Sequence, residues 1–217
     1  MQLLALIMYA HENKDFLPDD TGAHQSWDLV YAAGTYLAAG GAPYKVWYDP
    51  GTFMQFGDAD WVSFWNNTFA EYDNEDSLRI VGYAETLYGI GLYANSGSWD
   101  FSTNINQKLS ATSLSLNGVA LPLNISSRVL LACATISASG QLSQNLATMR
   151  SYSWTGLPHS LDPDVPGAKT FTSAHMLNAT LPSGGNLGML DGHVEWRRFQ
   201  DLIPRAGSAS EGPCFYY

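Results

Sequence analysis

The stretch GGNLGMLDGHVEWRRF, residues 184–199, decides how the C-terminal part of the chain folds. It carries Asp191, His193 and Glu195 at alternating positions, a spacing that an active site or a metal site could use. It also has the pattern of a β-hairpin, because Asp191 and Gly192 lie between two apolar segments. A type I′ turn requires positive φ at both central residues, which aspartate tolerates and glycine adopts readily. The stretch therefore predicts a hairpin that reverses at Asp191-Gly192.

The returning strand of this hairpin predicts which side chains face the interior. Successive side chains of a strand point to opposite faces, so Val194 and Trp196 share one face. His193 and Glu195 share the other face. Since a half-buried strand turns its apolar residues inward, we expect Trp196 in the core and His193 and Glu195 in water.

The alternative for the polar face of this strand is a metal site. Zinc accepts imidazole and carboxylate ligands, so His193 and Glu195 could bind it, with His175 from the preceding loop as a third ligand. A catalytic zinc site needs three protein ligands supported by further hydrogen bonds, and nothing in the sequence places His175 beside the other two. The expectation is a protein with no catalytic residue, no cofactor and no metal. The alternative keeps His175, His193 and Glu195 as ligands.

Composition bounds the class of protein. The chain has 217 residues, 46% of them apolar and 13% aromatic, which is enough for a substantial core. The net charge is −10, and only ten Lys and Arg residues are present, so nucleic acid is not an expected partner. Charged residues make up 14% of the chain, a composition typical of secreted or surface proteins. We therefore expect an exported protein in the periplasm, at the cell surface or in the extracellular space.

Two helices are expected near the start of the chain. Apolar residues recur at helical spacing over residues 2–13, and Asn13 supplies the stop. This helix would begin without a capping residue, as in a sequence cut from a longer helix. No stretch approaches the ~20 apolar residues of a membrane-spanning helix, and no signal-peptide pattern opens the chain. A second helix is expected over residues 26–37, with Ser26 as its cap.

The sequence pattern of the remainder of the chain is typical of short strands and turns. YKVWYDPG, residues 44–51, predicts a strand closed by a turn, and LRIVGYAETLYGIGLYA, residues 78–94, predicts two strands or one long strand with glycine breaks. Asn117-Gly118 between alternating apolar residues predicts a second hairpin. SRVLLACATI, residues 127–136, is nearly all apolar and predicts a central strand covered on both faces. A single α+β domain over residues 1–217 is the simplest account.

Two long loops, residues 57–77 and 138–174, are rich in Gly, Ser, Asn, Asp and Pro and belong on the surface. The acidic runs GDAD, 57–60, and EYDNED, 71–76, could bind calcium, but they lack EF-hand spacing and a solvated acidic loop is the expectation. GLPHSLDPDVPG, 156–167, holds a histidine, a serine and two aspartates. Members of a catalytic triad usually converge from distant segments, so turn chemistry explains this stretch better.

Four aromatic side chains in the first loop admit two interpretations. They could form a platform on which a sugar stacks, or their spacing could place them on one face of a short helix that docks on the sheet. Core or subunit contact is the expected use of these side chains, which are Trp61, Phe64, Trp65 and Phe69.

Two separated stretches resemble one family. LLALIMYAHENKDFLP, residues 3–18, resembles the segment just after the membrane-spanning part of the first helix in bacterial type IV prepilin-like and pseudopilin-like proteins. GGNLGMLDGHVEWRRFQDLIPR, residues 184–205, with the aromatic end CFYY, 214–217, is similar to their C-terminal motif, which is named for a histidine, nine residues and Asp-Gly. The resemblance brackets nearly the whole chain.

Two features depart from the family pattern. Fifteen residues rather than nine separate His175 from Asp191, so an insertion lengthens this loop if His175 is the motif histidine. The apolar leader helix, with its glycine cleavage site and glutamate, is absent from the sequence. This absence is expected either of the soluble part of a longer product or of a protein that does not enter a membrane.

The resemblance implies a fold and a function. The fold is pilin-like: a long N-terminal helix, of which residues 1–16 are the remnant, packs on an antiparallel sheet with long surface loops. The function is that of a non-catalytic subunit of a type IV pilus-like or type II secretion pseudopilus-like filament, whose partners are other pilin-like subunits. An apolar half-helix before Met1 would anchor the subunit in the membrane and later bundle with its neighbours. Subunit contacts are expected at Leu3, Leu6, Ile7, Phe215, Tyr216 and Tyr217.

The two cysteines, Cys133 and Cys214, lie far apart in no metal-binding spacing, so the sequence does not predict zinc bound through cysteine. In the family that the chain resembles, the position of Cys133 is often aspartate or another polar residue, and a cysteine near the end is not part of the pattern. Two unusual cysteines together predict a disulfide, which in an oxidising compartment would contribute on the order of 2 to 4 kcal/mol. The alternative is two free thiols, with Cys133 buried.

The sequence is therefore compatible with three functions. The leading one is the filament subunit. The second is an extracellular surface module that binds carbohydrate or calcium through the aromatic and acidic loops. The third is a metal-dependent hydrolase centred on His175, His193 and Glu195.

Overall fold

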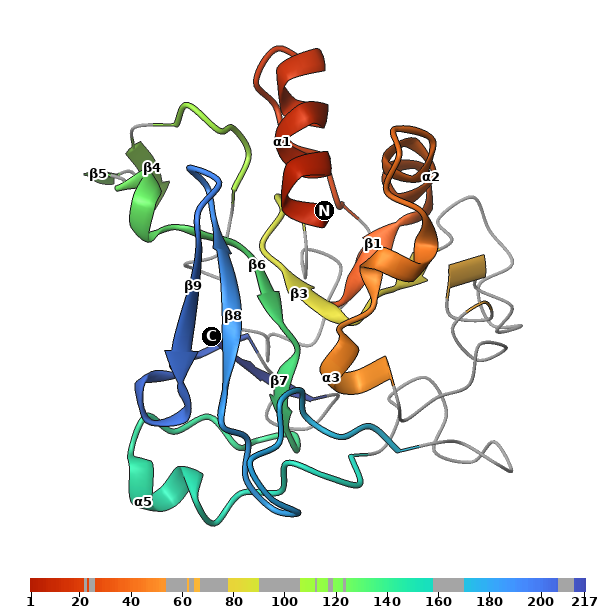
Figure 1. Cartoon of the computed structure of the whole chain (residues 1–217). Coiled ribbons are helices and arrows are strands. Elements are labelled where there is room, and N and C mark those ends of the chain that lie inside the picture. Colours follow the sequence, from red (N-terminus) through yellow and green to blue (C-terminus); the bar gives the residue numbers. More distant parts are fainter. Residues whose placement is uncertain are drawn as a thin grey trace.

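A four-stranded antiparallel sheet is the main element of the computed structural model (Figure 1). Its strand order is β3-β6-β8-β9. Helices and antiparallel sheets are mixed, so the α+β class predicted from the sequence is confirmed. These four strands are β3 (Tyr83–Glu85), β6 (Val129–Cys133), β8 (Gly184–Met189) and β9 (Val194–Arg198). The structure describes residues 1–21, 23, 26–53, 62, 65–66, 78–89, 106–111, 113–116, 119–122, 124–157, 170–206 and 213–217.

The described strands also form three smaller antiparallel sheets, in which each strand is three or four residues long. The pairs are β1 with β2, β4 with β5, and β11 with both β7 and β10. These strands are β1 (Asp28–Val30), β2 (Leu78–Ile80), β4 (Ser113–Leu116), β5 (Val119–Pro122), β7 (Thr135–Ser137), β10 (Pro204–Ala206) and β11 (Cys214–Tyr216).

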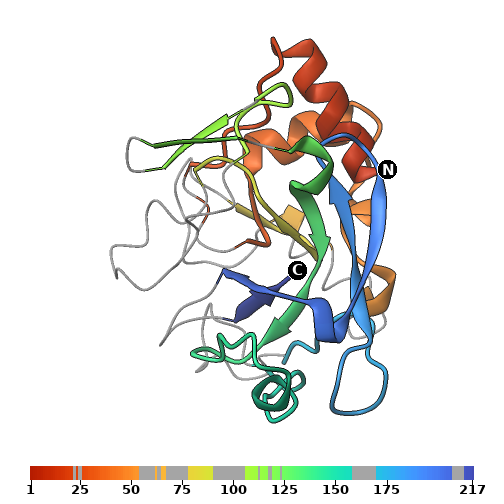
Figure 2. The ribbon, with the colours of Figure 1, turned by 90° about the vertical axis from the view of Figure 1, so that its left-hand side faces the viewer.

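The two longer described helices, α1 and α2, lie together at one end of the main sheet (Figures 1 and 2). Among the helices that the structure describes, none is long and apolar enough to cross a membrane. The helices and 3-10 turns are α1 (Gln2–Glu12), α2 (Tyr31–Ala39), η1 (Tyr44–Trp47), α3 (Pro50–Phe53), η2 (Ile125–Ser127), α5 (Leu146–Met149) and η3 (Phe199–Asp201).

Helix α1 forms over nearly the predicted residues. It ends at Asn13, whose side-chain Nδ2 donates to the carbonyl of Tyr9 at 2.8 Å. As predicted, no side chain caps its start. Leu3 packs on β8, because a Cβ placed on Gly188 would lie 3.1 Å from Leu3 Cδ2. The inner face of α1 is therefore held against one end of the main sheet (Figure 2).

The second helix begins later than predicted. The prediction of a helix from Ser26 is wrong, because residues 28–30 pair with β2 as strand β1 and α2 starts only at Tyr31. The backbone N–H of Val30, the residue before α2, donates to a carboxyl oxygen of Asp20 at 2.6 Å. This bond ties the start of α2 to the segment before β1, and Ser26 does not cap the helix.

The predicted strand at residues 44–51 is also wrong, because this stretch forms η1 and α3. Trp47 is fully buried, and its indole N–H donates to the carbonyl of Ala42 at 2.9 Å. Pro50 takes the first position of α3, where the missing N–H of proline is not needed. The Trp47 indole bonded back to Ala42 and Pro50 at the first position of α3 both fit tight helical turns rather than an extended strand.

The other strand predictions are confirmed within the described residues, which leave out 90–94, 117 and 118. Residues 78–94 begin with two strands, β2 and β3, separated at Gly82. The segments on either side of Asn117-Gly118 pair as an antiparallel hairpin. In the apolar run at residues 127–136, β6 lies between β3 and β8, and every residue from 130 to 134 is buried.

The hairpin of β8 and β9 is confirmed, but its turn is not type I′. Gly192 has φ +93°, whereas Asp191 does not have a positive φ. The N–H of Gly192 donates to the carbonyl of Met189 at 2.9 Å, and the N–H of Met189 donates to the carbonyl of His193 at 2.8 Å. These bonds close a three-residue loop, in which a type I turn is followed by a left-handed glycine.

The extra loop residue reverses the faces of β9. Leu187 of the core lies opposite Glu195, and Asn186 lies opposite Trp196. A register shift of one residue moves every side chain of a strand to the other face. Val194 is consequently 62% exposed and Trp196 47% exposed, so the prediction that Trp196 enters the core is wrong.

The C-terminal tail lies inside the protein. Phe215 and Tyr216 are fully buried in β11, the middle strand of its sheet, and Tyr217 is also buried. The ring of Phe215 packs edge-on against Trp27, with centroids 5.3 Å apart. Leu3 and Leu6 are likewise buried and Ile7 is partly covered. The residues expected at subunit contacts are therefore mostly used within the chain, which corrects that prediction.

Of the four aromatic residues predicted to make a core or subunit contact, the structure describes only Trp65. Its side chain is buried and stacks on Trp47, with ring centroids 6.4 Å apart and planes at 30°. The expectation of a core contact is confirmed for Trp65. Trp61, Phe64 and Phe69 lie outside the described residues.

Candidate metal centre

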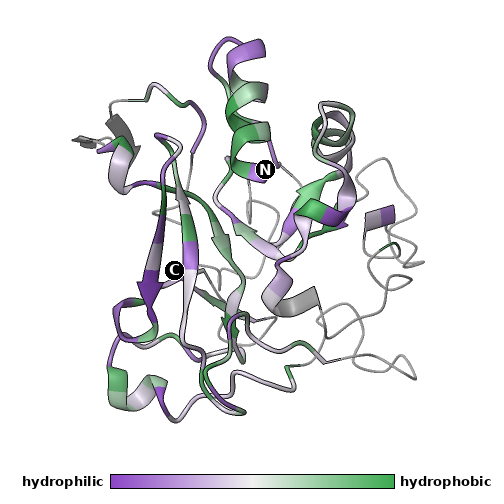
Figure 3. Cartoon of the chain, viewed as in Figure 1, coloured by the Kyte–Doolittle hydropathy of each residue, from purple (hydrophilic) through white to green (hydrophobic). Residues whose placement is uncertain are grey.

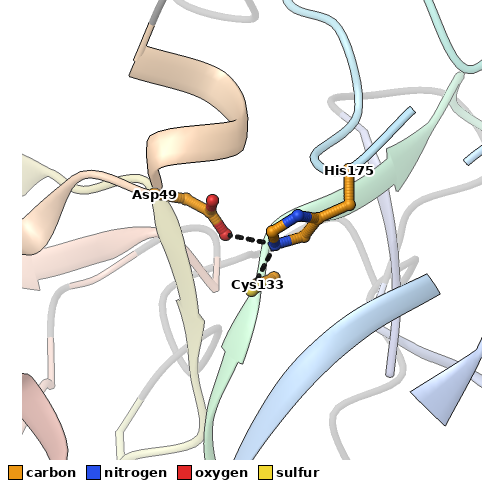
Figure 4. A group of neighbouring side chains, drawn as sticks. All are labelled: Asp49, Cys133 and His175. Atoms are coloured by element: carbon orange, nitrogen blue, oxygen red, sulfur yellow. Dashed lines mark hydrogen bonds and ion pairs between the residues drawn. The ribbon is translucent and has the colours of Figure 1, made fainter. Parts of the chain in front are cut away.

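Three side chains from distant parts of the sequence converge beside the main sheet (Figure 4). Asp49 directly precedes α3, Cys133 is the last residue of β6, and His175 lies in the loop before β8. One ligand atom from each side chain can be chosen so that all three lie within 4.8 Å of one another. Within the part of the chain that the structure describes, this is the one group of His, Cys, Asp or Glu residues with the spacing of a metal site.

Both partners of His175 face the same ring nitrogen. Cys133 Sγ lies 3.1 Å from His175 Nε2, and Asp49 Oδ2 lies 3.3 Å from that same atom. Figure 4 shows the two dashed lines meeting at one nitrogen. In a catalytic triad the nucleophile and the carboxylate bind opposite nitrogens of the imidazole. The arrangement is therefore not a Cys-His-Asp relay but three donor atoms around one point.

Asp49 is held by the turn that follows it. Its Oδ1 accepts a hydrogen bond from the N–H of Gly51 at 2.7 Å, which leaves Oδ2 directed at His175. Gly51 itself has no room for a side chain, because a Cβ there would lie 2.9 Å from the backbone nitrogen of His175 and 3.1 Å from Asp49 Oδ1. The Asp-Pro-Gly sequence thus brings the start of α3 against the loop of His175.

His175 is fixed from two sides. Its φ is +50°, a conformation that few residues other than glycine adopt. Its carbonyl accepts hydrogen bonds from both the backbone N–H and the hydroxyl of Ser183, at 2.8 and 2.7 Å. The ring of Trp196 packs edge-on against the imidazole, with centroids 5.3 Å apart. The solvent-facing side of β9 therefore contributes to the site.

The electrostatics favour an ionised Asp49 and a protonated Cys133. Burial raises the pKa of Asp49, but hydrogen bonds from His175 and Cys133 outweigh it and hold that pKa below its usual value. The hydrogen bond to Asp49 raises the pKa of His175. Burial, together with the charge of Asp49, raises the pKa of the Cys133 thiol. A cysteine nucleophile needs a lowered pKa, so Cys133 is not activated for attack.

The metal ligands proposed from the sequence are not assembled. His193 is exposed, and its Nδ1 lies 2.6 Å from Asp191 Oδ1 within the hairpin loop. Glu195 Oε1 lies 2.6 Å from Arg197 Nη2. Among the described residues the metal-like group contains His175 but neither His193 nor Glu195. Of the three residues in that alternative, only His175 belongs to this group, and the structure does not bring His193 and Glu195 to it.

The two cysteines do not form the predicted disulfide, because both are free thiols. Cys133 lies opposite Tyr83 in the main sheet, whereas Cys214 lies opposite Ser137 in a smaller sheet. Strands β6 and β11 are not paired with each other, and no disulfide joins the two residues. The alternative of free thiols, with Cys133 buried, is confirmed.

The residues of the calcium interpretation, and those of the sugar interpretation apart from Trp65, lie outside the described part of the chain. The acidic runs 57–60 and 71–76 are not described, nor are residues 158–167 of the proline-rich loop. Calcium and carbohydrate binding therefore stay predictions.

The chain matches no protein-family model, no curated protein and no solved structure. The structure places the chain in one fold class, that of mixed α+β proteins with antiparallel sheets. Function has to be inferred from the geometry of the chain itself.

Proposed function

We propose that this protein is a pilin-like structural subunit of a type IV pilus-like or type II secretion pseudopilus-like filament. The observation that carries the proposal is that α1 is apolar on both of its faces. Leu3 and Leu6 are buried against the rest of the chain. On the opposite side, Met1, Leu4 and Met8 are 70%, 59% and 47% exposed.

The exposed side chains form one stripe. Residues three and four positions apart lie on the same side of a helix, so Met1, Leu4 and Met8 follow one another along the surface. A helix on the surface of a globular protein ordinarily turns polar residues outward, and a contiguous apolar surface marks an interaction site. Figure 3 shows the apolar character of the middle turns of α1.

The occupant that we propose for this stripe is the N-terminal helix of a neighbouring pilin-like subunit. Full burial of a side chain such as leucine or methionine contributes about 1.5 to 3 kcal/mol, so even partial cover of three of them favours association. The packing of Leu3 on β8 supports the proposal, since a pilin-like subunit lays its first helix against an antiparallel sheet. The low content of charged residues, 14%, agrees with export to the periplasm or cell surface.

A paired substitution on α1 tests the proposal. Changing Leu4 and Met8 to glutamate places charges on the exposed stripe and leaves the buried Leu3 and Leu6 untouched. We expect this variant to fold, as judged by circular dichroism, and to give no filaments by electron microscopy of cells that produce it. Leu177→Glu is the matched control, because Leu177 is 70% exposed and does not lie on α1. Filaments as abundant as those of the parent would show that α1 does not make the subunit contact.

A further inference from the structure

We propose that Asp49, Cys133 and His175 form a binding site for one zinc-class divalent cation per chain. The three donors come from three separate elements, so the ion would tie α3, β6 and the loop before β8 together. Nothing in the filament function requires this site, and its test is independent of assembly.

The spacing of the donor atoms fits a tetrahedral ion. Typical zinc bond lengths for sulfur, nitrogen and oxygen place S and N about 3.6 Å apart and N and O about 3.3 Å apart in a tetrahedral site. The structure has 3.1 Å between Cys133 Sγ and His175 Nε2, and 3.3 Å between His175 Nε2 and Asp49 Oδ2. A movement of about half an ångström by the sulfur brings the S–N distance to the zinc value. The chosen donor atoms of Cys133 and Asp49 lie within 4.8 Å of each other, so the third distance is also compatible with one shared ion.

The donor set selects the class of metal. A thiolate, an imidazole and a carboxylate are ligands that zinc accepts, whereas calcium and magnesium take oxygen ligands. Cys133 loses its proton to solvent when the ion binds. Asp49 and the Cys133 thiolate then carry two negative charges, which balance the charge of the ion beside a neutral His175. Three protein ligands leave a fourth position for water.

The surroundings of the three donors resemble those of a metal site. The second oxygen of Asp49 is bound by Gly51, so the carboxylate is oriented by a hydrogen bond of the kind that supports ligands in metal centres. Trp196 covers part of the imidazole. The competing account is a hydrogen-bond hub, in which the thiol and the imidazole simply satisfy the buried carboxylate. The two accounts differ in one observable, the uptake of a metal ion.

Cobalt provides the direct probe. The protein is stripped with a chelator under reducing conditions and titrated with Co²⁺, which replaces zinc and absorbs light when a thiolate is bound to it. We expect a thiolate-to-cobalt charge-transfer band that saturates at one equivalent and is displaced by Zn²⁺. The band in the parent protein reports cysteine ligation without any substitution, so the test does not depend on a variant that folds.

Variants then identify the ligands. Cys133→Ser should abolish the charge-transfer band, and His175→Gln and Asp49→Asn should weaken zinc binding by more than the roughly 10- to 100-fold typical of losing a supporting partner. Cys214→Ser removes the other buried thiol, and His193→Gln removes the exposed histidine of the hairpin; both should bind zinc as the parent does. Circular dichroism checks that each variant is folded.

Three outcomes would overturn the site. The first is a parent protein that takes up neither Co²⁺ nor Zn²⁺ at one equivalent, which would establish the hydrogen-bond hub. The second is a charge-transfer band that survives in folded Cys133→Ser and disappears in Cys214→Ser. The third is loss of zinc binding in His193→Gln with full binding in His175→Gln, which would move the site to the hairpin.

Discussion

The indole of Trp196 stands edge-on against the imidazole of His175, with ring centroids 5.3 Å apart and planes at 80°. The contact joins the edge strand β9 to the loop that carries one member of the candidate metal centre. Trp196 is 47% exposed, and besides His175 it lies over Gly184, where a Cβ would be 3.0 Å from Trp196 Cζ2. Pairs of this geometry add about 0.5 to 1.5 kcal/mol beyond the area that they bury.

Removal of the indole should therefore destabilise the protein. We expect Trp196→Ala to lower the free energy of unfolding by at least about 0.5 to 1.5 kcal/mol, measured in denaturant. Val194→Ala is the control, since Val194 lies two residues away on the same exposed side of β9. Surface substitutions of this kind usually change stability by no more than about 0.5 kcal/mol. Equal losses in both variants would mean that the contact with His175 contributes nothing.

The free thiols give a second prediction. Cys133 and Cys214 lie on strands of different sheets and are not bridged. Protein denatured without a reductant should therefore show two reactive thiols per chain with a chromogenic disulfide reagent. The same value is expected after reduction, which serves as the control for oxidation during handling. A chain with no reactive thiol before reduction and two afterwards would establish the bridge.

The hairpin loop gives a third prediction. An L-residue in the left-handed region loses roughly 1 to 2 kcal/mol, and Gly192 has φ +93°. A Cβ at Gly192 would also lie 3.3 Å from Ile7 Cδ1 of α1. Gly192→Ala should consequently destabilise the protein by about 1 to 2 kcal/mol or more in denaturant unfolding.

Gly156→Ala separates the two causes at Gly192. Gly156 has φ +65°, and a Cβ there would meet nothing within 4 Å, so its substitution reports backbone strain alone. A larger loss at Gly192 than at Gly156 is expected and would measure the contact with α1. A loss at Gly192 no larger than that at Gly156 would show that Ile7 adapts to the added methyl group.

The hairpin also shows how far the sequence can predict this fold. Turn residues between apolar segments locate β8 and β9 correctly, because the signal lies within a few adjacent residues. The faces of β9 depend on whether the loop contains two residues or three, and Asp191-Gly192 is compatible with both. One loop residue therefore separates a correct hairpin from a wrong prediction for Trp196.

Local sequence patterns cannot predict the candidate metal centre, for a different reason. Asp49, Cys133 and His175 belong to three elements that only the tertiary structure brings together. The spacing of Cys133 and Cys214 bears only on a site that uses both cysteines, not on a site that combines one cysteine with a distant histidine and aspartate. His175 is the member of this site that the sequence singles out, but the partners that its sequence context offers, His193 and Glu195, are not its neighbours in the fold.

Two buried carboxyl groups lead to the last prediction. Asp20 and Glu85 are fully buried, and neither oxygen of Glu85 has a hydrogen-bond partner among the described residues. One oxygen of Asp20 accepts from Val30 N–H, and the other lacks a partner in the same described part of the chain. Burial, reinforced by the nearby charge of Asp28, raises the pKa of both carboxyl groups well above the usual value.

Raised carboxyl pKa values make these two groups destabilising as pH rises. Carboxyl groups of the unfolded chain lose their protons at about pH 4, whereas Asp20 and Glu85 in the folded chain keep theirs up to the raised pKa. The free energy of unfolding therefore falls as the pH rises through that range. Asp49, with its lowered pKa, has the opposite sign, so the variant must be compared with the parent at each pH. Asp20→Asn and Glu85→Gln should flatten the decline in unfolding free energy above pH 4, whereas Asp201→Asn, at an exposed carboxyl, should follow the parent. Parallel curves for all four proteins would show that Asp20 and Glu85 ionise normally in the folded state.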